Sequence, residues 1–356
     1  MTDRSRSAPP VLLGASQAGA SLTLASTAWM VSGLTASPLL NSLLPALGAL
    51  PLLVPLRRTP KGYGLQLLAV GVLIALSLAV GIKTFNPTPL LIGSFVAVLL
   101  FGVGQEMSSL PLQRRLLSQK SCSMLRLRRG QDVGALVGNL LAALLFPAIR
   151  QFVPALVLLL PLAGVAASPT IQGSTSEQPS GDPSTGEQHI PWDARCMLQG
   201  LVMGGLFALL ALWVRQVDGG KCFDFAMVLA AYGLGRIGVG LIPAWHRSLG
   251  YLLMAVLLVI TQAGVPAWLA VVLFLPIGAL AASTDAVLVA QLERLGDAPL
   301  RWQVMLRSGA VGGVVGSIGL GVICQLLTLS IALPLVVAGF LLLAITQLRS
   351  PLSLSR

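Results

Sequence analysis

The chain has 356 residues, of which 55% are hydrophobic and only 10% are charged, and its mean hydropathy is +0.85. So little polar surface cannot cover a water-soluble globule of this size, and the composition therefore predicts a membrane protein. A net charge of +11 would fit a nucleic-acid-binding protein. The basic residues argue against that class, because they fall almost entirely on one side of the predicted membrane.

Twelve apolar stretches are each long enough for a helix to cross about 30 Å of hydrocarbon. The first follows Arg4 and Arg6 in the manner of a secretory signal, but it is too long for such a signal and leads into further spans. We therefore predict an all-α membrane protein with twelve transmembrane helices in two pseudo-symmetric six-helix bundles. The predicted spans are residues 11–34, 39–56, 64–82, 88–106, 131–149, 151–168, 196–214, 223–243, 249–264, 266–290, 306–327 and 329–348.

Basic residues set the predicted orientation, because cytoplasmic loops carry an excess of Lys and Arg. With the N-terminus inside, only Lys83, Arg150, Arg215 and Lys221 fall outside. We therefore expect both termini in the cytoplasm and the protein in the inner membrane of a bacterium. The long connection 107–130 is expected to lie along anionic lipid headgroups through its basic clusters.

Residues 168–194 form a polar interruption rich in Ser, Thr, Pro, Gly and Gln. Such a segment cannot bury enough apolar area to offset the entropy lost on ordering. We expect a flexible cytoplasmic linker there. It divides the chain into an N-terminal bundle, residues 1–167, and a C-terminal bundle, residues 195–356.

The two predicted bundles share short sequence matches. Residues 133–138 (VGALVG) and 311–316 (VGGVVG) are nearly the same and lie 178 positions apart, and a second match pairs Glu106 with Asp285 at an offset of 179. A common offset favours a duplicated bundle over chance. Glycines at every fourth position favour close helix packing, with a moving contact that gates a ligand as the alternative.

Three segments resemble a known family of transporters. Residues 28–40 (AWMVSGLTASPLL) are similar to a first outer loop, and residues 205–215 (GLFALLALWVR) with 230–235 (AAYGLG) are similar to the start of a second half. Together with the two halves, the linker and the glycine-rich helices, they resemble the major facilitator superfamily, and in particular its branch of bacterial siderophore and multidrug exporters. The resemblance implies a secondary transporter that moves a small organic solute by alternating access, and the branch implies export.

The chain departs from the family pattern at two places. Residues 51–62 (PLLVPLRRTPKG) keep the basic cluster of the superfamily's loop signature but lack its aspartate. The fifth span has Gly138-Asn139 where the antiporter signature has Gly-Pro. The missing proline weakens the inference of antiport. The altered loop signature motivates an alternative function, a non-transporting membrane protein on the same fold, such as an assembly or pigment-delivery factor.

Polar residues within the spans are the first candidates for a binding site. First helices of this family line the central cavity, so Gln17 and Ser21, one turn apart, are candidate substrate contacts, with Asn41 and Gln199 as weaker ones. Ordinary hydrogen bonding between helices is the alternative for all four. Asp132, at the predicted start of the fifth span, is expected to cap that helix.

Arg236 is the most informative charge, because a charge within a span is costly unless it is paired or hydrated. In a central cavity its guanidinium would hold a carboxylate or phosphate, which would make the substrate an anion. The alternative is a structural ion pair with Asp285 in the tenth predicted span.

Glu106 and Asp285 lie near the cytoplasmic ends of their predicted spans. A carboxylate that is partly removed from water holds its proton more readily, so both are candidates for proton coupling. The family resemblance implies instead that each acid latches a basic residue. The implied partners are Arg57 or Arg58 for Glu106, and Arg247 or Arg236 for Asp285.

The sequence does not indicate an enzyme active site. There is no phosphate-binding loop, the only histidines are His189 and His246, and the four cysteines are isolated. We therefore expect no enzyme, no metal and no cofactor. The expected partners are a small solute, protons and membrane lipids, and the expected state is a monomer. The predicted function is proton-coupled export.

Overall fold

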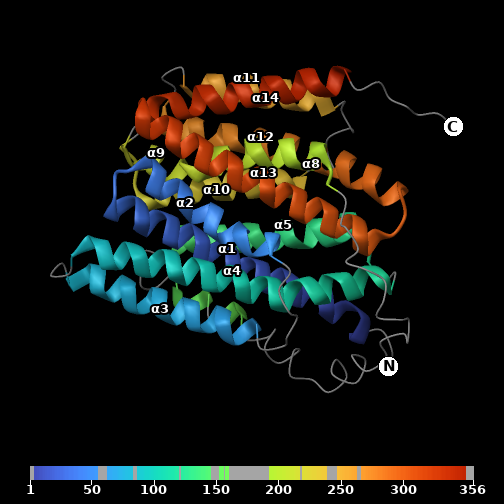
Figure 1. Ribbon diagram of the computed structural model, residues 1–356, viewed down its shortest axis with the longest axis horizontal. Coiled ribbons are helices and arrows are strands. Elements are labelled where there is room, and N and C mark those ends of the chain that lie inside the picture. Colours follow the sequence, from blue (N-terminus) through green and yellow to red (C-terminus); the bar gives the residue numbers. More distant parts are fainter. Residues whose placement is uncertain are drawn as a thin grey trace.

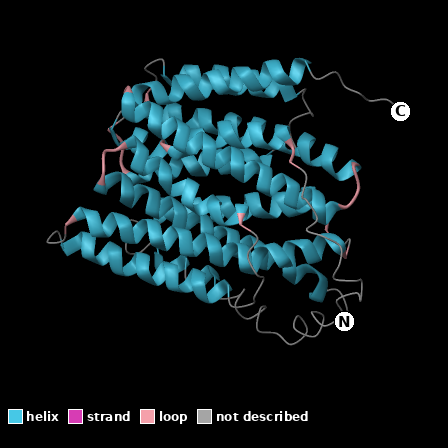
Figure 2. Ribbon diagram, in the orientation of Figure 1, coloured by secondary structure: helices cyan, strands magenta, loops and turns pink. Residues whose placement is uncertain are grey.

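The computed structural model describes residues 4–54, 62–82, 86–119, 122–145, 152–155, 157–159, 192–216, 219–238, 247–262 and 266–349. Within these ranges the chain forms helices and short connections and no strand (Figure 2). Most of the predicted linker 168–194 lies outside the described residues, as do Arg57 and Arg58.

The helices of the first part of the chain follow the predicted spans. They are α1 (Arg4–Leu34), α2 (Pro38–Ala49) with the 3-10 turn η1 (Leu50–Leu53), α3 (Gly62–Ile82), α4 (Pro87–Ser118) and α5 (Met124–Leu144). In the sixth predicted span, only the short helical pieces 152–155 and 157–159 are described, and they pack on α1 beside Gly19. We call α1 to α5 the N-terminal half.

The second part of the chain begins with a helix that is interrupted at Leu209. Its helices are α8 (Ala194–Ala208), α9 (Leu210–Gln216), α10 (Cys222–Ile237), α11 (Arg247–Gln262), α12 (Ala267–Arg294), α13 (Ala298–Leu326), the 3-10 turn η4 (Leu329–Ile331) and α14 (Ala332–Arg349). We call α8 to α14 the C-terminal half.

Six of the described helical segments are long and apolar enough to cross a membrane. They are Gly62–Gly81, Pro87–Ser118, Ala194–Gln216, Trp268–Arg294, Ala298–Leu326 and Leu329–Gln347. Pro38–Leu53 and Arg247–Gln262 are apolar but shorter. The chain is therefore an all-helical, multi-pass membrane protein, and the predicted layout of twelve spans is confirmed in part.

Two sequence-based expectations about the segment 107–130 are wrong. It is not a long connection, because α4 continues to Ser118 and α5 already begins at Met124. Asp132 does not cap α5, since the hydroxyl of Ser123 does so by accepting a hydrogen bond from the Arg126 N–H at 3.2 Å. A hydropathy window detects only the part of a helix in hydrocarbon, whereas Arg, Gln and Leu continue the helix beyond it.

The two halves lie side by side with their helices running along the same general direction (Figure 1). Helices α11 and α14 lie at one edge of the bundle and α3 at the opposite edge. Within the halves, α1 packs on α5, α3 on α4, α8 on α13 and α10 on α12. The halves meet where α5 packs on α10 and α2 packs on α13.

The repeated glycines produce the same packing in both halves. A side chain at Gly134 or Gly138 of α5 would collide with carbonyl oxygens of α1, those of Gly14 and Ala18. Gly312 and Gly316 of α13 stand in the same way against carbonyl oxygens of α8. The predicted close packing is confirmed, because these backbones approach too closely for any residue with a Cβ.

One end of the bundle is closed by an apolar cluster that joins both halves. We call it the inner end, where α4 ends and α5 begins. Leu116, Leu117 and Met124 pack there with Leu292 and Trp302, and all five are buried. The indole N–H of Trp302 donates to Oε1 of Gln113 across the halves at 2.8 Å. The sequence predicts this end to be cytoplasmic.

Candidate binding site between the halves

A cavity of about 530 Å³ lies between the halves, next to the apolar cluster of the inner end. Its lining comes from both halves, chiefly from α5, α8, α10, α12 and α13. A volume of this size lies within the range of sites for small organic ligands. The polar and aromatic residues that line it are Gln17, Arg128, Gln131, Asp132, Asn139, Gln199, Phe207, Tyr232, Arg236 and Asp285.

Four of these residues form an ion network at the cavity wall. The Arg236 guanidinium donates from Nε and Nη2 to both oxygens of Asp132, at 2.8 and 3.3 Å. Its Nη2 also lies 2.6 Å from Oδ2 of Asp285. The guanidinium of Arg128 donates to the same Oδ2 at 3.0 Å. We call Arg128, Asp132, Arg236 and Asp285 the ion network.

The network joins the halves, because each half supplies one cation and one anion. Arg128 and Asp132 stand on α5, four residues apart, while Arg236 stands on α10 and Asp285 on α12. The side chains of Arg236, Asp132 and Asp285 expose only 9%, 12% and 12% of their surface. Pairing is therefore essential here, since one unpaired charge among nearly buried neighbours is strongly destabilising.

Neutral side chains complete the network. Gln199 on α8 donates its amide N–H to Oδ1 of Asp285, and the Tyr232 hydroxyl lies 3.3 Å from Nη1 of Arg236. The start of α8 is fixed by Asp193, whose carboxylate accepts the backbone N–H of Arg195 at 2.8 Å. Burial opposes ionisation of Asp193, but the Cys196 N–H and the Arg195 charge lower its pKa below the ordinary value. The capped helix holds Gln199 against Asp285.

Three of the five predicted substrate-binding residues line the cavity and two lie elsewhere. Gln17 and Gln199 are part of the cavity wall, as is Arg236. Ser21 instead packs where α1 crosses α5 at Gly138. The Asn41 side chain donates to the carbonyl oxygens of Thr35 and Ser37, at 3.0 and 2.9 Å, and so stabilises the start of α2.

The predicted gating residues are not gathered in one place. Arg247 begins α11 and contacts Gln291, Gln347 and the Tyr251 hydroxyl at 3.3 to 3.5 Å rather than Asp285. Glu106 is buried on α4, with 8% of its surface exposed. Its predicted latch partners Arg57 and Arg58 lie outside the described residues, so that latch stays a prediction.

Arg128, Asp132 and Asn139 are site residues that the sequence reading missed. With residues 131 and 135, which also line the cavity, they form one face of α5 at intervals of three and four residues. That spacing was visible in the sequence. A fifth span that begins at residue 131 leaves Arg128 in a loop and so hides this face.

The opposite end of the bundle is closed by a different contact between the halves. The Arg215 guanidinium on α9 lies 4.0 Å from the centre of the Trp29 ring and donates to the Trp29 carbonyl oxygen at 2.9 Å. The same indole stacks on Phe225 of α10, with ring centres 5.9 Å apart. No carboxylate takes part among these residues, so this end is joined by aromatic and cation–π contacts.

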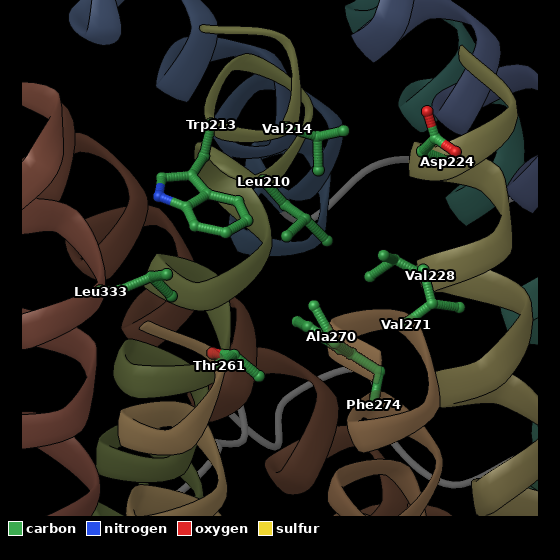
Figure 3. Close-up of a pocket in the computed structure, with 10 residues that line it drawn as sticks. All are labelled: Leu210, Trp213, Val214, Asp224, Val228, Thr261, Ala270, Val271, Phe274 and Leu333. Carbon is green, nitrogen blue, oxygen red and sulfur yellow. The ribbon is translucent and has the colours of Figure 1, made fainter. Parts of the chain in front are cut away.

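A second pocket lies near that end, within the C-terminal half (Figure 3). Trp213, Val228, Thr261, Phe274 and neighbouring apolar side chains surround it, with Asp224 at one side. Its volume of about 20 Å³ suits a single water molecule and excludes an organic solute. The cavity between the halves is therefore the better candidate site. Among the described residues, no group of His, Cys, Asp and Glu is arranged to hold a metal.

Comparison with known proteins shows the fold. No protein-family model and no curated protein matches the chain. Among solved structures, the nucleoside transporter NupG is similar with a TM-score of 0.58 and 11% identity, covering 96% of this chain and 98% of that one. A D-xylose-proton symporter gives 0.61 and 12%, covering 96% of each. The human organic anion transporter MFSD10 (TETRAN) gives 0.53 and 13%, covering 98% of this chain and 100% of that one. The chain therefore has the fold of major facilitator superfamily transporters.

Proposed function

We propose that the chain is a secondary transporter that exports a small organic solute in exchange for protons by alternating access. The observation that carries the proposal is the cavity of about 530 Å³ between two halves that are joined at both ends by different contacts. Rocking of the halves would open one end while the other stays closed. The three similar structures are transporters for different solutes, so they support transport and do not select a substrate.

The ion network supplies a means of opening the inner end without leaving a charge unpaired. Two of its pairs cross between the halves, Arg236 with Asp132 and Arg128 with Asp285. When the halves part, Arg236 can keep Asp285, which lies in its own half, and Arg128 can turn to Asp132 on the same helix. Residues four apart on a helix are neighbours. Partner exchange therefore leaves each half electrically neutral.

Protons couple to this step through the buried carboxylates. A proton on Asp132 would remove the charge that holds Arg236 from the opposite half, and would favour separation of the inner end. Asp285 and Glu106 are further proton acceptors on the same side of the bundle. Export and proton coupling rest on the family resemblance and on these carboxylates, and the expected setting is a monomer in a bacterial inner membrane.

The test compares the metabolites of a deletion strain with those of its parent, followed by flux of the accumulated compound into proteoliposomes. An exporter predicts that a compound accumulates in the deletion strain and that its flux collapses when a protonophore is added. Flux that ignores the protonophore would remove proton coupling. No flux of any solute, together with a partner that co-purifies, would favour the non-transporting alternative.

A further inference from the structure

We propose that the cavity takes a solute without net charge, rather than the anion that Arg236 alone would suggest. This inference rests on the proposed transport function and names the chemical class of the solute. The cavity wall holds two guanidinium groups and two carboxylates, and no other charged side chain among the described residues that line it.

Each cation of the wall is already paired with a carboxylate. Arg236 makes two contacts with Asp132, one with Asp285 and one with the Tyr232 hydroxyl. Arg128 directs its Nη2 to Asp285. An anionic solute would have to displace a carboxylate that is held at 2.6 to 3.0 Å and would leave it nearly buried without a partner. Because such a carboxylate is costly, the network disfavours anions.

A cationic solute is disfavoured for the same reason, because the carboxylates of the wall are already paired. Both oxygens of Asp132 already face Arg236, and both oxygens of Asp285 accept hydrogen bonds from Arg236, Arg128 or Gln199. A cation would have to compete with guanidinium groups already in place. Among the described residues, every charge on the wall therefore already has a partner of opposite sign.

The neutral part of the wall suits hydrogen bonding and ring stacking. Oε1 of Gln199 is buried without a hydrogen-bond partner, because its amide nitrogen faces Asp285. A hydroxyl or N–H group of a solute would satisfy it. Phe207 and Tyr232 meet edge to face in the same wall, with ring centres 4.9 Å apart, and offer a surface for a flat ring. A ring-bearing solute with hydroxyl or N–H donors fits both features.

Thiol labelling of the cavity tests the charge balance directly. The four native cysteines are replaced by serine and a single cysteine is introduced by Gln17→Cys, in the cavity wall. The full-length protein in detergent is then reacted with methanethiosulfonates carrying a negative, a positive or no charge. Each rate is divided by the rate of the same reagent with free mercaptoethanol. This readout needs no transport activity.

A balanced wall predicts normalised rates for the three reagents that agree within about threefold, since no net field acts on them. Asp132→Asn should then raise the rate of the anionic reagent relative to the uncharged one about five- to tenfold, and Arg128→Gln should raise the relative rate of the cationic reagent by a similar factor. Gel filtration checks that both variants remain folded. An anionic preference of tenfold or more without these substitutions would overturn the inference.

The compounds that accumulate in the deletion strain provide an independent check. Uncharged or zwitterionic compounds are expected, and a set made up of anions would overturn the inference while leaving transport intact. If no compound accumulates but the labelling rates are balanced, the proposed transport function fails and the charge balance of the cavity stands. The two failures are therefore distinguishable.

Discussion

Helices α5 and α13 occupy equivalent places in the two halves, yet only α5 carries charge into the cavity. Positions 128, 131 and 135 line the cavity on α5, and the positions 178 residues further on, Leu306, Gly309 and Gly313, line it on α13. Arg128 and Asp132 thus correspond to Leu306 and Ala310. The repeat preserves the packing and the cavity-lining face, while the ion network breaks the symmetry. Substitutions on these two helices can therefore separate the residues that pack the bundle from the residues that form the ion network.

The largest expected effect comes from removing the partner that α5 contacts across the halves. Arg236→Gln leaves two nearly buried carboxylates with only the partly exposed Arg128 to pair with, and should cost about 3–5 kcal/mol of stability. Thermal unfolding in detergent measures the loss. Arg236→Lys is the matched control, because it keeps the charge and loses the bidentate contact with Asp132. Its melting temperature should lie between those of Arg236→Gln and the unsubstituted protein. Equal melting temperatures for Arg236→Gln and the unsubstituted protein would contradict a stabilising role of the ion network.

The glycines test whether the two helices are equivalent as scaffold. Gly138→Ala and Gly316→Ala each place a methyl group against a backbone carbonyl of the neighbouring helix, and should each destabilise by about 1–3 kcal/mol. Gly130→Ala and Gly319→Ala are the controls, since no atom lies within 4 Å of a Cβ there. These should be neutral or slightly stabilising. A large difference between the two test variants would break the equivalence.

A double-mutant cycle tests the asymmetry itself. Arg128→Leu with Asp132→Ala gives α5 the residues of α13, and removes one charge of each sign. Each single variant leaves the network with an excess charge, whereas the double variant leaves Arg236 with Asp285, a pair within the C-terminal half. The double loss should therefore be smaller than the sum of the single losses by about 0.5–3 kcal/mol. Additive losses would show that the two residues act independently.

The smallest effect is expected at Asn139, which lies further along α5 than the charged residues. Asn139 donates to the Leu229 carbonyl across the halves at 3.3 Å, whereas its counterpart Ser317 donates to Gly204 within its own half at 3.2 Å. Alanine at either position should cost about 0.6 kcal/mol, as for other hydrogen bonds between membrane helices. Only Asn139→Ala should change the rate of opening between the halves. Hydrogen exchange of the backbone amides of α5 and α10 measures this opening. The exchange rate should change in Asn139→Ala and stay unchanged when Ser317 is replaced by alanine.

Much of the scaffold followed from the sequence, because hydropathy and glycine spacing report on local physics. Part of the span layout and the close packing at Gly138 and Gly316 could be read in that way, whereas the major facilitator fold was expected from the resemblance of short segments. The ion network could be read only in part. Arg236 with Asp285 was one of two predicted alternatives, but its contact with Asp132 depends on where α5 begins and on how the halves meet. Neither is set by a hydropathy window, since polar helix ends extend beyond the hydrocarbon.

The charge of the solute could not be read from a single residue either. Arg236 alone suggested an anion, because a lone guanidinium in a span would attract one. Its partners come from α5 and α12, more than forty residues away on either side, and they cancel that attraction. Charge balance is a property of the assembled wall.

The most direct test of the account is the distance between the halves at the inner end. Spin labels on cysteines introduced by Ser118→Cys and Leu295→Cys, in a background without native cysteines, report the separation of the ends of α4 and α12. Asp132→Asn removes the anion that holds Arg236 from the opposite half. The account predicts that it raises the ratio of long to short distances about tenfold, the effect of roughly 1.4 kcal/mol. An unchanged distance distribution in a folded Asp132→Asn variant would contradict it.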